Sequence, residues 1–161
     1  METDANRRVA QLRADAAAKA DATALFLEGL TVEQAGVKTE IGWTVAATAA
    51  HLAAGAGFGA MQLKQLKRGK APTVPVAALN AINFVMCRTN RTKPLADSVT
   101  KLREHTRVNL ALLDGWTDDE LETPYKKPYF GATTYEQGLR NALIRHFDEH
   151  MDQVVQALAK T

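Results

Sequence analysis

Residues 134–158 read TYEQGLRNALIRHFDEHMDQVVQAL, and the spacing of their apolar residues predicts the last long helix of the chain. Within this stretch, His146 and His150 are four residues apart. On a helix, two such side chains lie about 40° apart in azimuth and one turn apart in height. Both imidazoles can therefore reach the same ion, so the spacing is that of a pair of metal ligands.

The surroundings of this histidine pair are largely apolar. A helical wheel places these side chains in the same sector: Leu139, Ala142, Leu143, Gln153, Val154 and Ala157. The opposite side holds Asn141, Arg145, Asp148 and Asp152. Both histidines are therefore expected to face a neighbouring helix. They can be core histidines satisfied by hydrogen bonds; two of them at this spacing on an apolar stripe favour a metal site.

Periodic apolar residues predict further helices in the rest of the chain. These run from about Asn6 to Leu30, from Thr44 to about Lys67, from Ala77 to Asn90, and from Leu95 to a stop at Asp114-Gly115. Capping boxes of short helical turns are predicted at Thr31 with Gln34 and at Thr117 with Glu120. The sequence therefore predicts an all-α fold, a four-helix bundle with an additional short helix, in a single domain over residues 1–161.

The predicted helix that begins after Thr44 supplies a third imidazole. Thr44 suits the N-cap position, and Trp43 before it can pack on the entry of the helix. His51 lies on the same side of this helix as Phe58 and Gln62, so it is expected to be buried. By contrast, His105 lies at the margin of its apolar stripe and is expected to be half-exposed.

Three glycines alternate in Gly55-Ala56-Gly57-Phe58-Gly59. No predicted strand precedes them and no Lys-Ser or Lys-Thr follows, so the segment is not a phosphate-binding loop. Glycine in a helix costs up to about 1 kcal/mol relative to alanine. We therefore expect the glycines to permit close packing, a kink, or space for a ligand beside His51.

Three shorter features complete the pattern. Tyr125–Gly131 is aromatic and extended but has no partner run, so it is expected to be a loop over one end of the bundle. Thr133 with Glu136 is expected to cap the final helix. The single cysteine, Cys87, is expected to be a buried structural thiol.

Composition limits the classes of function. The chain has 161 residues and a formal net charge of +2, with acidic and basic residues interspersed. Its most basic stretch, Lys64–Lys70, is expected to be the solvated end of a helix, so no nucleic-acid partner is predicted. No signal peptide and no apolar run long enough to span a membrane is present, so a cytoplasmic protein without a membrane partner is predicted.

Three inward imidazoles, His51, His146 and His150, suit Zn²⁺, Ni²⁺, Cu²⁺ or Fe²⁺. Three protein ligands leave a coordination position for water or substrate, as in catalytic zinc sites. Gln62 and Gln153 also face inward, where they can hydrogen-bond a ligand or water, or fill a polar layer of the bundle. Glu149 flanks the histidine pair, either near a ligated imidazole or at a helix interface. No residue is assigned as a general base.

The constellation of Trp43-Thr44-Val45, Ala50-His51-Leu52 and residues 145–153, RHFDEHMDQ, resembles the DinB/YfiT-like family of metalloenzymes. This family includes the metal-binding domain of mycothiol-dependent maleylpyruvate isomerase. The resemblance spans nearly the whole chain, although its specific part is short. It implies a four-helix bundle that binds a divalent metal, often zinc or nickel, on a triad that maps onto His51, His146 and His150.

The resemblance also implies a function. Family members that are enzymes use low-molecular-weight thiols such as mycothiol for S-transfer or isomerisation, and homodimers are common. This chain ends at Thr161, without the additional carboxy-terminal domain of the maleylpyruvate isomerases, which argues against isomerase activity. We therefore expect a metal-dependent, thiol-dependent S-transferase, or a related or hydrolase-like enzyme, acting on a small electrophile. The alternative is a non-catalytic bundle that binds a metal or small ligand as a stress or sensor protein.

Overall fold

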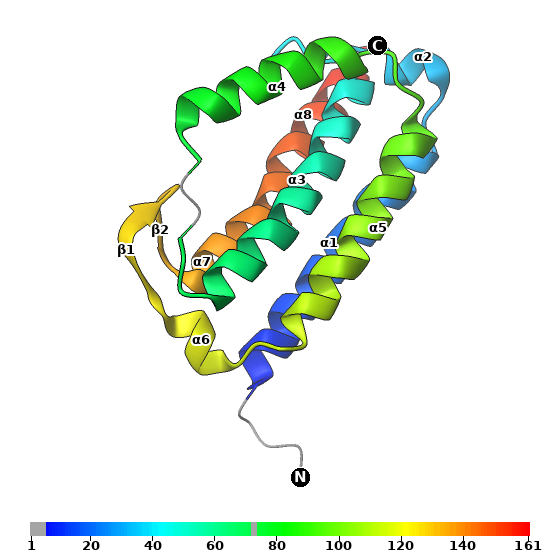
Figure 1. Cartoon of the computed structure of the whole chain (residues 1–161). Coiled ribbons are helices and arrows are strands. Elements are labelled where there is room, and N and C mark those ends of the chain that lie inside the picture. Colours follow the sequence, from blue (N-terminus) through cyan, green and yellow to red (C-terminus); the bar gives the residue numbers. More distant parts are fainter. Residues whose placement is uncertain (1–5, 72–73) are drawn as a thin grey trace.

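Four long helical segments form the body of the protein, whose structure is a computed structural model that describes residues 6–71 and 74–161. The segments are α1 (Arg7–Glu28), α3 (Val45–Lys67), α5 (Leu95–Leu113), and a final segment made of α7 (Tyr135–Arg140), η2 (Asn141–Arg145) and α8 (His146–Leu158). They lie side by side along a common direction in Figure 1. Helix α3 contacts both α5 and α8, and α1 contacts α5. The predicted all-α four-helix bundle is confirmed.

The short helices form where local capping predicts them. Thr31 begins α2 (Val32–Ala35) and Thr117 begins α6 (Asp118–Glu122), each with a complete capping box. Thr44 caps α3 by accepting a hydrogen bond from the backbone N–H of Ala47. These helix starts were predictable because a cap depends only on residues within one turn.

The start of the final helix differs from the prediction by one residue. Thr134, not Thr133, is the N-cap, and its hydroxyl accepts a hydrogen bond from the backbone N–H of Gln137. Thr133 instead donates from its backbone N–H and its hydroxyl to the side-chain oxygen of Gln137. With Thr134 as the N-cap, Glu136 is the second residue of the helix and not the third, so it does not form a capping box; its carboxylate pairs with Arg8 and Arg140.

The segment expected to be a loop is a small hairpin, so that prediction was wrong. Strand β1 (Pro124–Tyr129) pairs antiparallel with β2 (Ala132–Thr134). Phe130 and Gly131 form the turn, and both have positive φ angles, 47° and 76°. Two consecutive residues with positive φ are typical of the tight turn that matches the twist of a hairpin. The partner strand was missed because it is only three residues long.

Helix α4 (Val76–Asn90) lies outside the four-helix body and packs against α3. Figure 1 shows it on the side of α3 away from α1 and α5. Its sequence is apolar, yet none of its described side chains is buried. Cys87 on this helix is half-buried, not buried as predicted. Helix α4 is therefore the least buried of the long helices among the described residues.

Two clusters of buried side chains form the core. One lies toward the hairpin and includes Leu12, Leu63, Leu113, Leu121 and Leu139. The other includes Leu27, Leu52, Leu102, Phe147 and Val154. Phe147 lies between the two predicted ligand positions on α8 and is 2% exposed. Burial of this ring therefore fixes the rotation of the helix segment that carries His146 and His150. No helix within the described residues is long and apolar enough to cross a membrane.

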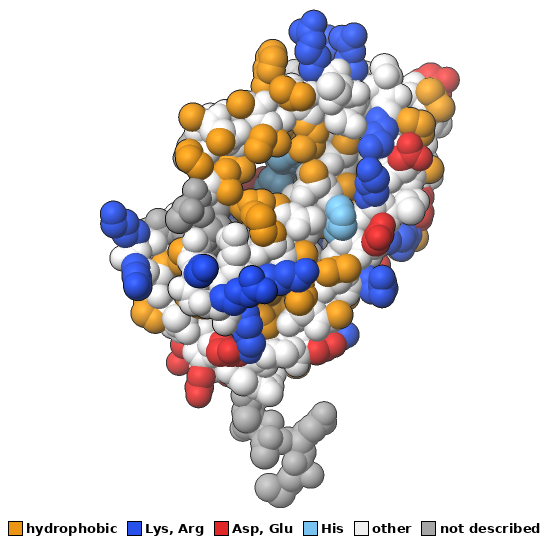
Figure 2. All heavy atoms as spheres, viewed as in Figure 1, with side chains coloured by type: hydrophobic (Ala, Val, Ile, Leu, Met, Phe, Trp, Pro, Cys, Tyr) orange, Lys and Arg blue, Asp and Glu red, His pale blue; other side chains and the backbone are white. Residues whose placement is uncertain are grey.

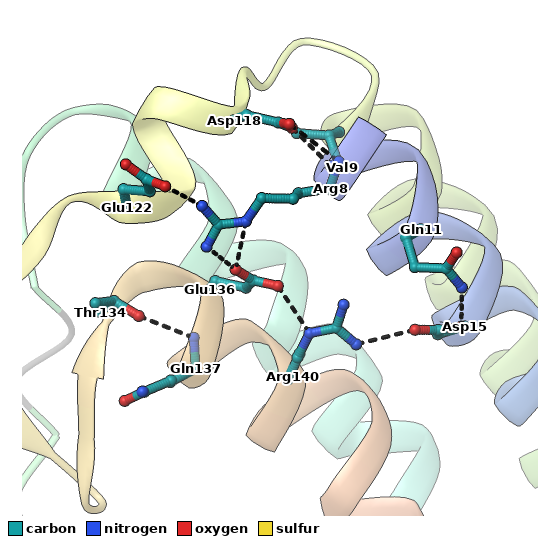
Figure 3. Close-up of polar contacts among 10 residues, drawn as sticks. All are labelled: Arg8, Val9, Gln11, Asp15, Asp118, Glu122, Thr134, Glu136, Gln137 and Arg140. Atoms are coloured by element: carbon teal, nitrogen blue, oxygen red, sulfur yellow. Dashed lines mark hydrogen bonds and ion pairs between the residues drawn. The ribbon is translucent and has the colours of Figure 1, made fainter. Parts of the chain in front are cut away.

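A network of charged side chains joins the first and last helices (Figure 3). Arg8 pairs with Glu122 and Glu136, and Arg140 pairs with Glu136 and Asp15. Burial of Glu136 favours its protonated form, but the hydrogen bonds and charges of Arg140 and Arg8 outweigh this and lower its pKa. The network sets the register of α7 against α1.

Candidate metal centre

Three histidines from distant parts of the chain meet at one point. His51 on α3 and His146 and His150 on α8 each offer one ring nitrogen, and these nitrogens lie within 4.8 Å of one another. The ring centroids are 4.7–4.8 Å apart. His51 is buried, and the other two are half-buried. Three imidazoles in this arrangement could hold a metal ion.

The three imidazoles are neutral near pH 7. Burial lowers the pKa of His51 to about 3, assisted by the charges of His146 and His150. Burial and the neighbouring His150 lower the pKa of His146 to about 4. Burial also lowers the pKa of His150, against the opposing effects of Gln153 and Glu149. Because a metal binds the neutral imidazole, no proton has to be removed before binding at neutral pH.

The surroundings of the rings also fit a metal. The Nδ1 atom of His51 is buried and has no hydrogen-bond partner. The Nδ1 atom of His150 lies 3.1 Å from the side-chain oxygen of Gln153, so Nδ1 donates the hydrogen bond. That bond leaves the lone pair on Nε2 of His150. A partner that fixes the tautomer in this way is typical of histidine ligands.

Replacing Gln153 by leucine is expected to lower metal affinity about tenfold, because partners of ligating histidines contribute about 10–100-fold. The variant removes the acceptor for His150 while keeping a side chain of similar size. Metal affinity can be measured by competition with a chromophoric chelator, with Gln156→Leu as the control on the exposed side of α8. Equal affinities of the two variants would contradict this role of Gln153.

Trp43 contributes a wall that sequence reasoning did not assign to the site. Its ring stacks on His150, with centroids 5.9 Å apart and planes at 11°, and meets His51 edge-on at 5.0 Å. Trp43 was expected to pack on the entry of α3. The available signal for this role was the position of Trp43 in the motif that carries the family resemblance. The sequence does not reveal, however, which element a ring just before a helix start contacts.

A π-helical turn, η2, immediately precedes His146. Such single turns often occur at functional sites. The wider turn rotates the residues before His146 relative to an uninterrupted α-helix. Asn141 and Arg145 line the same cavity as the histidines. The prediction that these two residues lie on the opposite side was therefore wrong; it assumed 3.6 residues per turn throughout.

The alternating glycines of α3 serve close packing. A Cβ atom at Gly55 would lie 3.3 Å from the ring of His146, and one at Gly57 would lie 3.0 Å from the ring of His105. His105 is half-buried, and its Nδ1 lies 2.8 Å from the carbonyl oxygen of Ala53. His105 is therefore bound to the backbone of α3 and is not a member of the histidine group. Gly55 makes room for the ring of His146, and it also lines the cavity beside His51.

A cavity of about 780 Å³ opens onto the histidines between α3, α4 and the final helix. Figure 2 looks into this hollow, where histidine atoms lie at the floor among hydrophobic side chains. Gln62 lines it and is 1% exposed, with its amide nitrogen 3.5 Å from the hydroxyl oxygen of Tyr125. Glu149 also lines it, but is exposed and accepts a hydrogen bond from Arg145 at 2.9 Å. The side chain of Gln153 does not line the cavity but is the hydrogen-bond partner of His150.

Acid is expected to destabilise the metal-free protein. An unfolded histidine has a pKa of about 6.5, whereas the folded chain holds that of His51 at about 3 and that of His146 at about 4. Between these values the unfolded chain binds more protons, so the free energy of unfolding falls as the pH falls below about 6.5. Thermal midpoints from about pH 8 to pH 5 should fall, and His146→Asn should flatten the dependence. A flat wild-type profile would contradict the prediction.

Comparison with known proteins gives the family. A model described as the DinB superfamily matches residues 15–159, which confirms the resemblance noted in the sequence. No curated protein and no solved structure gives a significant match. The match covers both α3, with His51, and α8, with His146 and His150. The chain therefore belongs to the DinB superfamily.

Proposed function

We propose that this protein is a metal-dependent enzyme in which His51, His146 and His150 hold one divalent transition metal, zinc or nickel. The observation that supports the proposal is the convergence of three neutral imidazoles within 4.8 Å at the floor of an open cavity. Two of them come from one helix and the third from a helix far away in the sequence. Three protein ligands would leave a coordination position for water or a substrate.

The reaction that fits best is transfer of a low-molecular-weight thiol, such as mycothiol, to a small electrophile. A bound divalent metal would favour the thiolate form of a thiol or polarise a carbonyl. The residues of the chain supply the rest. The three histidines hold the ligand positions, Gln153 fixes the tautomer of His150, and Trp43 restricts the motion of its ring.

Elemental analysis tests this proposal most directly. Protein expressed with zinc and nickel supplied should contain about one metal ion per chain, and it should consume a thiol when mixed with small electrophiles. Removal of the metal by a chelator should abolish turnover, and its return should restore it. Purified protein without stoichiometric metal would contradict the proposal.

One observation favours the alternative, a non-catalytic metal or ligand sensor. Among the described residues, the carboxylate that lines the cavity is that of Glu149, which is exposed and paired with Arg145. It is therefore poorly placed to act as a general base for a buried reaction. Stoichiometric metal without turnover, across a panel of thiols and electrophiles, would support the sensor role.

We also propose that the protein is cytoplasmic and forms a homodimer. Leu25 on α1 and Phe84 on α4 are 64% and 67% exposed, and such side chains would be covered in an assembly. Light scattering coupled to size-exclusion chromatography measures the mass of the assembly. A mass of 17.5 kDa, that of one chain, would contradict the dimer.

A further inference from the structure

One wall of the cavity carries an apolar stripe that the protein covers only in part. Leu79, Ile82 and Met86 on α4 follow the helical spacing of three and four and line the cavity, together with Asn80 and Asn83. Ile82 is 52% exposed although it faces this space. An apolar stripe of this kind on a surface helix is normally covered. A ligand in the cavity would cover it.

The opposite wall is also apolar and is long. On α3 it includes Phe58 and Met61, and it extends from His51 to Gln62, eleven residues further along the helix. At 1.5 Å per residue this distance is about 16 Å. Phe130 from the hairpin turn also lines the cavity. The space therefore suits an extended apolar molecule and not only a compact one.

The cavity has a cationic side chain near the histidines. Arg145 is the sole lysine or arginine that lines the cavity within the part of the chain the structure describes, and it directly precedes His146. Its Nε atom donates to Glu149 at 2.9 Å, and the side chains of Arg145 and Glu149 are 71% and 56% exposed. Its two terminal amino groups have no partner among the described residues. They can therefore donate a pair of hydrogen bonds to a carboxylate.

We propose that this cavity binds a small molecule with an extended apolar body and a single carboxylate head. Arg145 binds the head beside the histidines, and the body lies along the stripe of α4 opposite Phe58 and Met61. This inference deepens the proposed function. That the ligand is a substrate rests on the proposed function. Binding of the carboxylate itself needs only the cavity and Arg145.

The test uses hexanoate, octanoate and decanoate as probes, with titration calorimetry on the full chain after treatment with a chelator. Each added methylene group should lower the dissociation constant about fourfold, which corresponds to about 0.8 kcal/mol. Affinity that does not depend on chain length would overturn the apolar site. The protein is metal-free in this experiment, so the result does not depend on whether the purified protein contains a metal. Purified protein without metal would contradict the proposed function and leave this result unchanged.

Two variants test the placement of the ligand. Ala54 is exposed and lines the cavity, so Ala54→Trp should obstruct the part beside His51 and reduce octanoate affinity at least tenfold. Ala18→Trp on the exposed side of α1 is the matched control and should leave affinity unchanged. Equal affinities of the two variants would overturn the placement.

A third variant tests the head group. Arg145→Met should weaken octanoate binding about threefold, because the Arg145 side chain is 71% exposed and solvent screens its pairing with a carboxylate. Binding of 1-octanol, which carries no charge, should be unaffected by this change, and Arg145→Lys should restore part of the octanoate affinity. If octanoate binds Arg145→Met and the unaltered chain equally well, the assignment of Arg145 is wrong.

Discussion

Replacing His51 by alanine is expected to lower metal affinity by more than about 100-fold. Hydrogen-bond partners of ligating histidines already contribute about 10–100-fold, so loss of a ligand should cost more. His51 is also the ligand that joins α3 to the pair on α8. Without it, only the two imidazoles on one face of α8 would remain. Such histidine pairs also occur on protein surfaces. Competition with a chromophoric chelator measures the change.

His105→Ala is the matched control for this prediction. His105 contacts the backbone of α3, but it does not belong to the histidine group. Its loss should leave metal affinity within about twofold of the unaltered protein, since it touches no ligand. Circular dichroism should confirm that both variants remain helical. If metal content is unchanged in His51→Ala, or if both variants lose metal equally, the proposed centre is wrong.

Replacing Gly138 by alanine is expected to destabilise the protein by about 2 kcal/mol. A Cβ atom at this position would lie 2.3 Å from the hydroxyl oxygen of Tyr125 and 3.0–3.1 Å from two ring carbons. Tyr125 is buried and lies within reach of Gln62, so its ring cannot simply turn into solvent. Overpacking of this kind costs about 1–3 kcal/mol. For a chain of this size, the thermal midpoint should fall by about 4–8 °C.

Two companion variants separate overpacking from a general effect of glycine replacement. At Gly29 an added Cβ would lie 3.5 Å from its nearest neighbour, so Gly29→Ala should be neutral or slightly stabilising. In the double variant, Tyr125→Phe with Gly138→Ala, the closest contact is removed and part of the lost stability should return. An additive double variant would show that the contact with Tyr125 is not the cause.

The helices were predictable from the sequence because their signals are local. The caps at Thr31, Thr44 and Thr117 depend on neighbours within one turn, and the long helices repeat apolar residues over several turns. The hairpin was not predictable in the same way. Its second strand has three residues, too few to establish an alternating pattern, and its turn places Phe130 at a positive φ angle that this residue rarely adopts.

The histidine group was predictable because the expected burial of the three side chains and the spacing of two of them both favour it. His51, His146 and His150 lie on apolar faces of two helices that a bundle brings together. The rest of the site depended on tertiary contacts or on a local irregularity. Trp43 reaches His150 across the bundle, and Arg145 lines the cavity beside a π-helical turn. Neither effect leaves a periodic pattern in the sequence.

The π-helical turn of residues 141–145 lies between two parts of one continuous helix, and each part has to align with different neighbours. Before it, Glu136 must meet Arg8, and Gly138 must accommodate Tyr125. After it, His146 and His150 must meet His51. A π turn is equivalent to one residue added to an α-helix, so it supplies an angular offset between the two halves. Without this offset, either Glu136 would turn away from Arg8 or the histidine pair would turn away from His51.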